Sequence, residues 1–207
     1  MRFQFDQLSG NERYHLITQT IVPRPIAWIL TKNTNSTFNL APFSYFAPLS
    51  SGPALLVVSI GNKDQDTKKD TKVNLIREEE CVVHIPSGEL VASVNQSAMN
   101  LKNNESEVSY MNLALVDFTT RLPRIKEANV ALHCRLFDRH QLGNSNFDSL
   151  YLEILDVYIS DDIIAEKNTA EGNSRTTVDH DKLNPLGRLG GNHYSLLGET
   201  LTLKRPN

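Results

Sequence analysis

The sequence is poor in several features that would each indicate a class of protein. Among its 207 residues are only two cysteines, Cys81 and Cys134, which lie in apolar segments with no second cysteine or close histidine at metal-ligand spacing. We expect both to be buried thiols. No run of about 18 apolar residues could form a transmembrane helix, and residues 1–10 lack the basic and apolar regions of a signal peptide. A cytoplasmic protein with no membrane partner is therefore predicted.

An excess of positive charge is also absent. The 21 lysines and arginines against 24 acidic residues give a formal net charge of −3, whereas binding to a phosphate backbone needs a basic surface. We therefore expect no nucleic-acid partner. The sequence also lacks a P-loop, a Gly-x-Gly-x-x-Gly fingerprint, a Gly-x-Ser-x-Gly elbow and a histidine pair at metal spacing. These absences count against kinases and hydrolases and give no support to a metal site.

Short strand-like segments separated by turn formers make up much of the sequence. The expected strands, each rich in apolar or β-branched residues, cover residues 25–31, 54–60, 81–85, 130–136 and 149–159. The first should form a hairpin with residues 39–46, and the second should be buried on both faces. In the last, the apolar alternation shifts by one residue, which predicts a β-bulge near Ile154.

Helices and irregular segments complete the expected architecture. Three helices are expected, one with Asp70 or Thr71 as its N-cap, one over residues 90–101 and a short one over residues 105–111. The irregular segments should be an N-terminal arm, a mobile surface loop and a strand-like tail, at residues 1–16, about 165–181 and 199–203. No composition break divides the chain, so we predict a single β-rich (α+β) domain over residues 1–207, a small barrel with helices on its outside.

Residues 39–46 (NLAPFSYF) bring a polar amide, a proline, a hydroxyl and three aromatic rings together. Pro42 has no backbone N–H, so this stretch should form a sheet edge, a bulge or a bend rather than a central strand. Such a bend could present the Asn39 amide and the Ser44 hydroxyl beside an aromatic wall, which suits a flat ligand with polar edges. The alternative is an aromatic hairpin that only packs.

Three other motifs could contact a ligand. Residues 69–71 (KDT), at an expected helix start, would offer free backbone N–H groups and an ammonium to a phosphate, or could be an ordinary capped helix end. Residues 23–25 (PRP) hold an arginine that could meet a fixed acceptor or only lead into a strand. Residues 188–191 (RLGG), with Tyr194 nearby, could allow close approach of a ligand or form only a turn.

Taken in order, these motifs resemble those of the flavin reductase-like proteins, a family of FMN-binding split β-barrels. The similarity covers about residues 17–203 and rests on residues 23–28, 39–46, 69–71 with Asn74, and 188–191 with Tyr194. The resemblance implies a homodimer with FMN bound near the subunit interface, NADH or NADPH as hydride donor, and an acceptor such as a partner oxygenase. FMN would carry the redox chemistry, so no catalytic side chain is predicted.

The resemblance also implies a set of cofactor-binding residues. Those expected around the phosphate are Lys69, Asp70 and Thr71, with help from Arg24. Those expected at the edge of the flavin ring are Asn39, Ala41, Pro42 and Ser44. The set is completed by Asn74, Arg188 and Tyr194.

One departure from the family pattern bears on activity. Many active reductases of this family have Gly-Asp-His just before the strand that begins here near Ser149, whereas this chain has Asn146-Phe147-Asp148. The missing histidine weakens the expectation of rapid hydride transfer but leaves the FMN-binding motifs intact. Two hypotheses follow: an NAD(P)H-dependent FMN oxidoreductase that passes electrons to an acceptor, or a non-catalytic FMN-binding or flavin-carrier protein.

Overall fold

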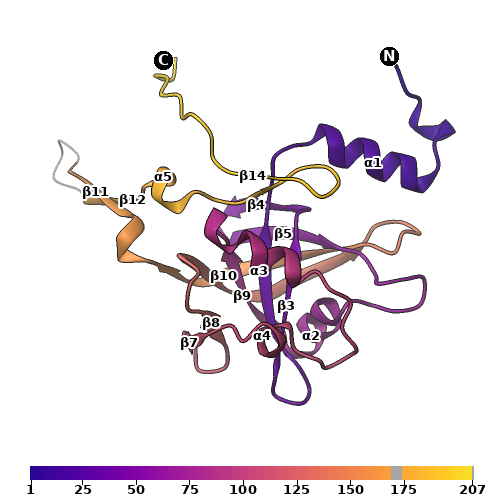
Figure 1. The fold of residues 1–207 in the computed structure, drawn as a ribbon, viewed down its shortest axis with the longest axis horizontal. Helices are drawn as coiled ribbons and strands as arrows, with labels where there is room; N and C mark the ends of the chain where they lie inside the picture. The colour runs from indigo at the N-terminus through magenta and orange to yellow at the C-terminus, as the bar shows by residue number, and fades with distance from the viewer. Residues whose placement is uncertain (169–173, 207) are drawn as a thin grey trace.

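The computed structural model describes residues 1–168 and 174–206. Its main element is a seven-stranded antiparallel sheet with strand order β3-β2-β6-β9-β10-β5-β4 (Figure 1). The seven strands are β2 Ala27–Lys32, β3 Phe38–Phe43, β4 Phe46–Ser51, β5 Ala54–Ile60, β6 Glu80–Ile85, β9 Val130–Gln141 and β10 Asp148–Ile159. All five expected strands are therefore confirmed, as is the hairpin between β2 and β3.

The chain connectivity forces this sheet to roll up. Strands β3 and β4 lie at opposite edges of the sheet, yet only Ser44 and Tyr45 separate them in the chain. That link can span about 11 Å at most, so the two edges must come round to face each other. The Tyr45 carbonyl accepts from the backbone N–H of Ser59 at 2.8 Å and holds the link against β5. Pro42 thus lies on an edge strand, as predicted.

Two apolar clusters form on the two faces of the rolled sheet. The interior cluster, inside the barrel, consists of Ala27, Ile29, Phe43, Leu56, Val58, Ile60, Leu75, Cys81, Val83, Cys134, Leu150 and Leu152. The outer cluster lies between the sheet and the helices and includes Trp28, Leu30, Leu40, Val82, Val94, Val108 and Ile125. Strand β2 contributes to both clusters. Both cysteines are buried free thiols, as expected.

The register of β10 on β9 contains the predicted bulge. The pairing shifts between Ile154 and Asp156, where the apolar alternation in the sequence changes phase. A second shift lies between Tyr151 and Leu152. The apolar residues Leu155, in the bulge, and Val157, just after it, are about half exposed.

Helices surround the barrel rather than forming a layer of their own. They are α1 Gly10–Thr20, α2 Asp70–Glu78, α3 Val91–Gln96, α4 Glu107–Tyr110 and α5 His180–Leu183, with one-turn 3-10 helices at Phe5–Gln7, Gly88–Leu90 and Asp161–Ile163. In Figure 1, α3 and α4 lie over the near face of the sheet, while α1 projects from the barrel. No helix in the described ranges is long and apolar enough to cross a membrane.

Two helical details differ from the expectations. Helix α1 occupies much of the expected N-terminal arm and is fixed by a capping box between Ser9 and Glu12. The amphipathic helix expected over residues 90–101 ends at Gln96. There the Ser97 hydroxyl donates to the Val94 carbonyl at 2.9 Å, a local bond that competes with helix continuation.

Three small sheets complete the fold. Strands β1 Arg24–Pro25, β13 Gly187–Arg188 and β14 Tyr194–Ser195 form one; β7 Leu115–Asp117 and β8 Pro123–Ile125 form the second; β11 Ile164–Asn168 and β12 Ser174–Val178 form the third. The prediction of a surface loop over residues 165–181 was wrong in part, because residues 164–168 and 174–178 pair as antiparallel strands. Residues 169–173 of that segment lie outside the described residues. Residues 199–203 form no strand in the described chain, and Leu201 and Leu203 are highly exposed.

His84 on β6 is a structural histidine. It is fully buried, its Nδ1 lies 3.0 Å from the Trp28 carbonyl and its Nε2 accepts from the Ile125 N–H at 3.0 Å. These contacts assign the proton to Nδ1 of a neutral ring. Burial lowers the pKa of His84 to about 4, against the opposing effect of its bond to the Trp28 backbone.

The free energy of unfolding should fall as the pH drops from 6.5 toward 4. An unfolded histidine titrates near 6.5, so in this window the unfolded state binds a proton that the folded state does not. The contribution of His84 is present in full above pH 6.5, and about 3 kcal/mol of it should be lost by pH 4. Urea unfolding from pH 4 to 7 should show a shallower pH dependence for His84→Gln, and an unchanged slope would contradict this assignment.

Candidate functional site

Two neighbouring hollows lie along the end of β3. The small hollow, of about 70 Å³, faces the first turn of α2; the larger hollow, of about 210 Å³, faces β13 and β14. Both are lined by Pro42, Phe43 and Ala98, so they are parts of one groove along the stretch from Asn39 to Ser44. The groove lies where the two sheet edges meet.

Helix α2 presents an uncapped N-terminus to the small hollow. Lys69 is the N-cap residue and, in the chain as described, no side chain caps the helix. The prediction of Asp70 or Thr71 as N-cap was therefore wrong. The Asp70 carboxylate is engaged elsewhere, since it accepts from Lys63 Nζ at 2.7 Å. The first backbone N–H groups of α2 and its partial positive charge are thus left for an anion.

The ammonium of Lys69 reinforces this positive potential. Its side chain lines the small hollow and forms no hydrogen bond or ion pair with any described residue. Burial lowers the pKa of Lys69, nearby Lys63 lowers it further, and Asp70 raises it. Lys63 is already paired with Asp70, so Lys69 is the half-buried cation here that lacks a partner among the described residues, and such a cation is unfavourable until an anion joins it. The small hollow therefore has the chemistry and the size of a phosphate site.

Lys63, which also lines the small hollow, was not predicted as a site residue. It lies seven residues before α2 in a polar turn, and its ammonium reaches both Asp70 and, at 3.2 Å, the Leu101 carbonyl. The turn folds back on itself through a bond from the Lys63 N–H to the Thr67 carbonyl. Nothing periodic in the sequence marks such a residue, because only the tertiary fold brings it to the helix start.

Glu107 on α4 is the second missed residue. It is 5% exposed, lines the small hollow, and accepts from the Leu40 backbone N–H at 2.9 Å. Burial raises the pKa of Glu107, against the opposing hydrogen bond from Leu40. The carboxyl group thus gives a hydrogen-bond acceptor to a backbone N–H of the edge strand β3, next to the small hollow.

A buried polar network holds α2 against β2 and β3. The Asn39 amide donates to Thr71 Oγ1 at 2.8 Å and to Thr31 Oγ1 at 3.2 Å. The Asn74 amide donates to the same Thr31 oxygen and, at 2.8 Å, to Asn33 Oδ1. All five side chains are at most 3% exposed. Asn39 and Asn74 therefore position the helix start, and Thr71 is the member of this network that also lines the hollow with Asn39.

The larger hollow combines aromatic walls with an unsatisfied guanidinium. Arg188 Nη2 donates to the Gly191 carbonyl at 2.6 Å, and its Cζ lies 4.5 Å from the centroid of the Tyr194 ring. Its Nη1 is buried and has no hydrogen-bond partner in the described chain. Buried donors are rarely left unpaired, so this N–H suits an acceptor on a bound ligand. Tyr14 and Phe43 add further rings to the lining.

Arg24 lies apart from the small hollow. Its guanidinium donates to Thr18 and Ile21 carbonyls at the end of α1, to the Leu189 carbonyl, and to Ser44 Oγ. Only 7% of the residue is exposed. Arg24 therefore links α1 and the segment at Leu189 to the β3–β4 link, and these bonds use four of its five N–H donors.

The predicted residues thus divide into three groups. Those brought to the small hollow are Asn39, Ala41, Pro42, Lys69, Asp70 and Thr71. Those brought to the larger hollow are Pro42, Ser44, Arg188 and Tyr194. Those placed behind the groove as supports are Arg24 and Asn74.

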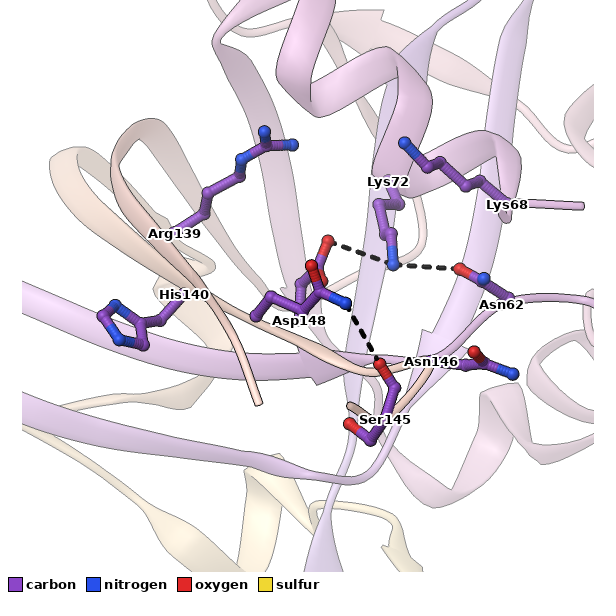
Figure 2. Close-up of a pocket in the computed structure, with 9 residues that line it drawn as sticks. Asn62, Lys68, Lys72, Arg139, His140, Ser145, Asn146 and Asp148 are labelled. Atoms are coloured by element: carbon purple, nitrogen blue, oxygen red, sulfur yellow. Dashed lines mark hydrogen bonds and ion pairs between the residues drawn. The ribbon is translucent and has the colours of Figure 1, made fainter. Parts of the chain in front are cut away.

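Residues 146–148, which replace the Gly-Asp-His of the family, are outside both hollows. Asp148 forms an ion pair at 3.0 Å with Lys72 on α2, whose Nζ also donates to Asn62 Oδ1 at 2.9 Å (Figure 2). Lys72 is 2% exposed. Asp148 therefore neutralises a buried lysine.

The comparison with known proteins identifies the family. The model of the flavin reductase like domain matches residues 19–176, about three quarters of the chain. The chain therefore belongs to the flavin reductase-like family, and its fold is the split barrel expected from the sequence. The family and the structural neighbours together indicate that the protein is a flavin-related oxidoreductase.

Three similar proteins cover nearly the whole chain. The uncharacterized protein YwrF of Bacillus subtilis (strain 168) is 36% identical over 212 residues, which span 99% of this chain and 98% of that protein. Nitrilotriacetate monooxygenase component B from Bacillus cereus has a TM-score of 0.87 and 29% identity, with 98% of each chain covered. Pseudomonas fluorescens 2-nitrobenzoate 2-nitroreductase NbaA has a TM-score of 0.85 and 27% identity, with 100% of this chain and 96% of that chain covered.

Proposed function

We propose that this protein binds FMN in the groove along β3 and uses it as an NAD(P)H-dependent oxidoreductase. The observation that carries the proposal is the Lys69 ammonium, which lies unpaired and half-buried at the uncapped start of α2. A phosphate monoester satisfies both the ammonium and the first N–H groups of the helix. The isoalloxazine ring would then extend along β3 into the larger hollow.

Different residues of the groove would contact different parts of FMN. Lys69, Lys63 and the Thr71 backbone would hold the phosphate, while the edge of β3 at Ala41 and Pro42 would face the ring. At the far end, the free Nη1 of Arg188 would donate to a ring oxygen or nitrogen. FMN supplies the hydride acceptor, and the protein binds it, orients it and tunes its potential. A guanidinium beside the ring favours the anionic reduced flavin.

The acceptor of the electrons is a further part of the proposal. One structural neighbour is named as a component of a monooxygenase and another as a nitroreductase. We propose a partner oxygenase as the acceptor for this chain, in the cytoplasm, with NADH or NADPH as donor. The alternative function, an FMN carrier with little turnover, is favoured by one observation: the residues at the Gly-Asp-His position include no histidine, and Asp148 is engaged by Lys72.

A visible spectrum of the purified protein, before and after NADH or NADPH is added without oxygen, tests these functions. Bound FMN should give a flavin absorption band that bleaches with the nicotinamide. A band that does not bleach would support the carrier function. Protein that stays colourless after incubation with FMN, with no heat of binding, would overturn both.

We propose that the active unit is a homodimer. An apolar hollow of about 290 Å³ lies between α1 and β4, and it shares Ser44 with the larger hollow of the groove. Ile21 lines it and is 61% exposed. A second subunit seated there would cover apolar surface and close the flavin groove beside the interface.

Ile21→Glu should weaken dimerisation about 100-fold, because a charged carboxylate would have to be buried at the interface. Sedimentation velocity over a micromolar concentration range measures the change. Leu142→Glu, which places the same charge at another half-exposed apolar position, is the matched control and should leave the dimer unaffected. A monomeric wild-type protein, or an Ile21→Glu dimer of wild-type strength, would contradict this interface.

A further inference from the structure

A hollow larger than either part of the flavin groove lies outside that groove. It has a volume of about 460 Å³ and lies between the first turn of α2, the end of β5 and the β9–β10 turn. Its lining residues are Asn62, Lys68, Lys72, Arg139, His140, Gln141, Ser145, Asn146 and Asp148. None of the predicted cofactor residues lines it. We call it the α2 hollow.

Positive charge dominates the α2 hollow. Its floor is the Lys72–Asp148 ion pair, in which the two charges compensate each other and Asn62 Oδ1 accepts a further bond. Lys68 and Arg139 are exposed and flank the hollow from opposite sides (Figure 2), and neither side chain is paired with another described residue. Two uncompensated cations thus face one cavity in a chain whose net charge is −3.

The rest of the lining is polar and uncharged. The amides of Gln141 and Asn146 and the hydroxyl of Ser145 can donate or accept hydrogen bonds, a combination that suits hydroxyl groups. His140 is the one ring in the described lining, and in Figure 2 it points away from the hollow. The α2 hollow therefore offers no aromatic face for a base to stack on.

We propose that the α2 hollow binds a phosphorylated ribose or a similar sugar phosphate. The phosphate would lie between Lys68 and Arg139, because a guanidinium and an ammonium both form strong charge-assisted bonds to its oxygens. The sugar hydroxyls would meet Gln141, Ser145 and Asn146. The cavity is several times larger than the small hollow that suits a phosphate alone. This site does not depend on flavin binding.

Two sources could supply such a ligand. One is the 2′-phosphorylated ribose of NADPH, because Lys68 and Lys69 are consecutive and their side chains line the α2 hollow and the small hollow of the flavin groove, respectively. Only the first turn of a helix about 10 Å across separates the two hollows. The other source is a free sugar phosphate that binds independently of the redox reaction. The first source would make the protein selective for NADPH over NADH.

Calorimetric titration of the full-length protein, with FMN added in excess, tests the site. The probes are 2′,5′-ADP, which carries the 2′-phosphorylated ribose of NADPH, and ribose 5-phosphate. We expect at least one probe to bind, and Lys68→Ala and Arg139→Ala each to weaken it about tenfold or more. Both positions are exposed, so these variants should fold. Tighter binding of 2′,5′-ADP assigns the dinucleotide source, and tighter binding of ribose 5-phosphate assigns the free sugar phosphate.

Two control variants separate this site from the flavin groove. Lys126→Ala removes an exposed cation elsewhere and should not change probe binding. Lys69→Ala should weaken FMN but not the probes. Failure of both probes to bind at millimolar concentration, or binding that only Lys69→Ala weakens, would overturn the proposal, whereas a protein that binds the probes but not FMN would overturn only the flavin function.

Discussion

Lys69→Ala should weaken FMN binding by about 1.5–3 kcal/mol, the value of a hydrogen bond to a charged group. This corresponds to a roughly 10- to 150-fold higher dissociation constant. The reason is that Lys69 has no ion-pair partner among the described residues and lies next to the uncapped start of α2. Calorimetric titration of FMN into the wild-type and variant proteins measures the difference.

Riboflavin distinguishes a phosphate contact from general damage to the groove. It has the flavin ring without the phosphate, so its affinity should be the same for the wild-type and Lys69→Ala proteins. Lys126→Ala, an exposed cation elsewhere, should bind both ligands normally. Equal weakening of FMN and riboflavin by Lys69→Ala would contradict the placement of the phosphate.

Asp148→Ala should lower the free energy of unfolding by about 3 kcal/mol. The substitution leaves Lys72, which is 2% exposed, without the carboxylate that neutralises it, and an uncompensated buried charge is strongly destabilising. The bond from Lys72 to Asn62 remains, which keeps the loss at the low end of the usual range. Urea unfolding monitored by circular dichroism at neutral pH measures it.

The same experiment tests whether Asp148 stabilises the fold by neutralising Lys72. A second variant, Lys72→Met with Asp148→Leu, removes both charges and should recover most of the lost stability. Arg121→Ala removes an exposed partner of Glu78 and Glu80 and should lose less than about 1 kcal/mol. If Asp148→Ala were as stable as the wild type, Lys72 would not depend on this pair.

Two motifs that were expected to share a ligand site lie close together in the structure. Residues 39–46 and 69–71 were predicted to meet at a cofactor, and the structure brings both to the small hollow. Strand positions were also predictable, since buried strands have unambiguous apolar patterns. The proline in β3 correctly indicated an edge strand. Apolar strand patterns and the position of a proline are local features of the chain, so they can be read from the sequence alone.

The hydrogen-bond partners of individual side chains could not be predicted from the sequence. The guanidinium of Arg24, expected to help hold a phosphate, is bonded to carbonyls from the end of α1 and from Leu189, which is 165 residues away, and no sequence pattern predicted these bonds. Asp70 was expected as a cap, but Lys63 takes its carboxylate. The Arg24 bonds depend on groups far apart in the chain, and the Lys63–Asp70 bond depends on how the turn before α2 folds back; neither follows from a periodic pattern.

A crystal structure of the protein with FMN tests the central claim most directly. We predict a phosphate within hydrogen-bond distance of Lys69 Nζ and of the first backbone N–H groups of α2, with the ring along Ala41 and Pro42 toward Arg188. Phosphate bound elsewhere, for example between Lys68 and Arg139 in the α2 hollow, would contradict it.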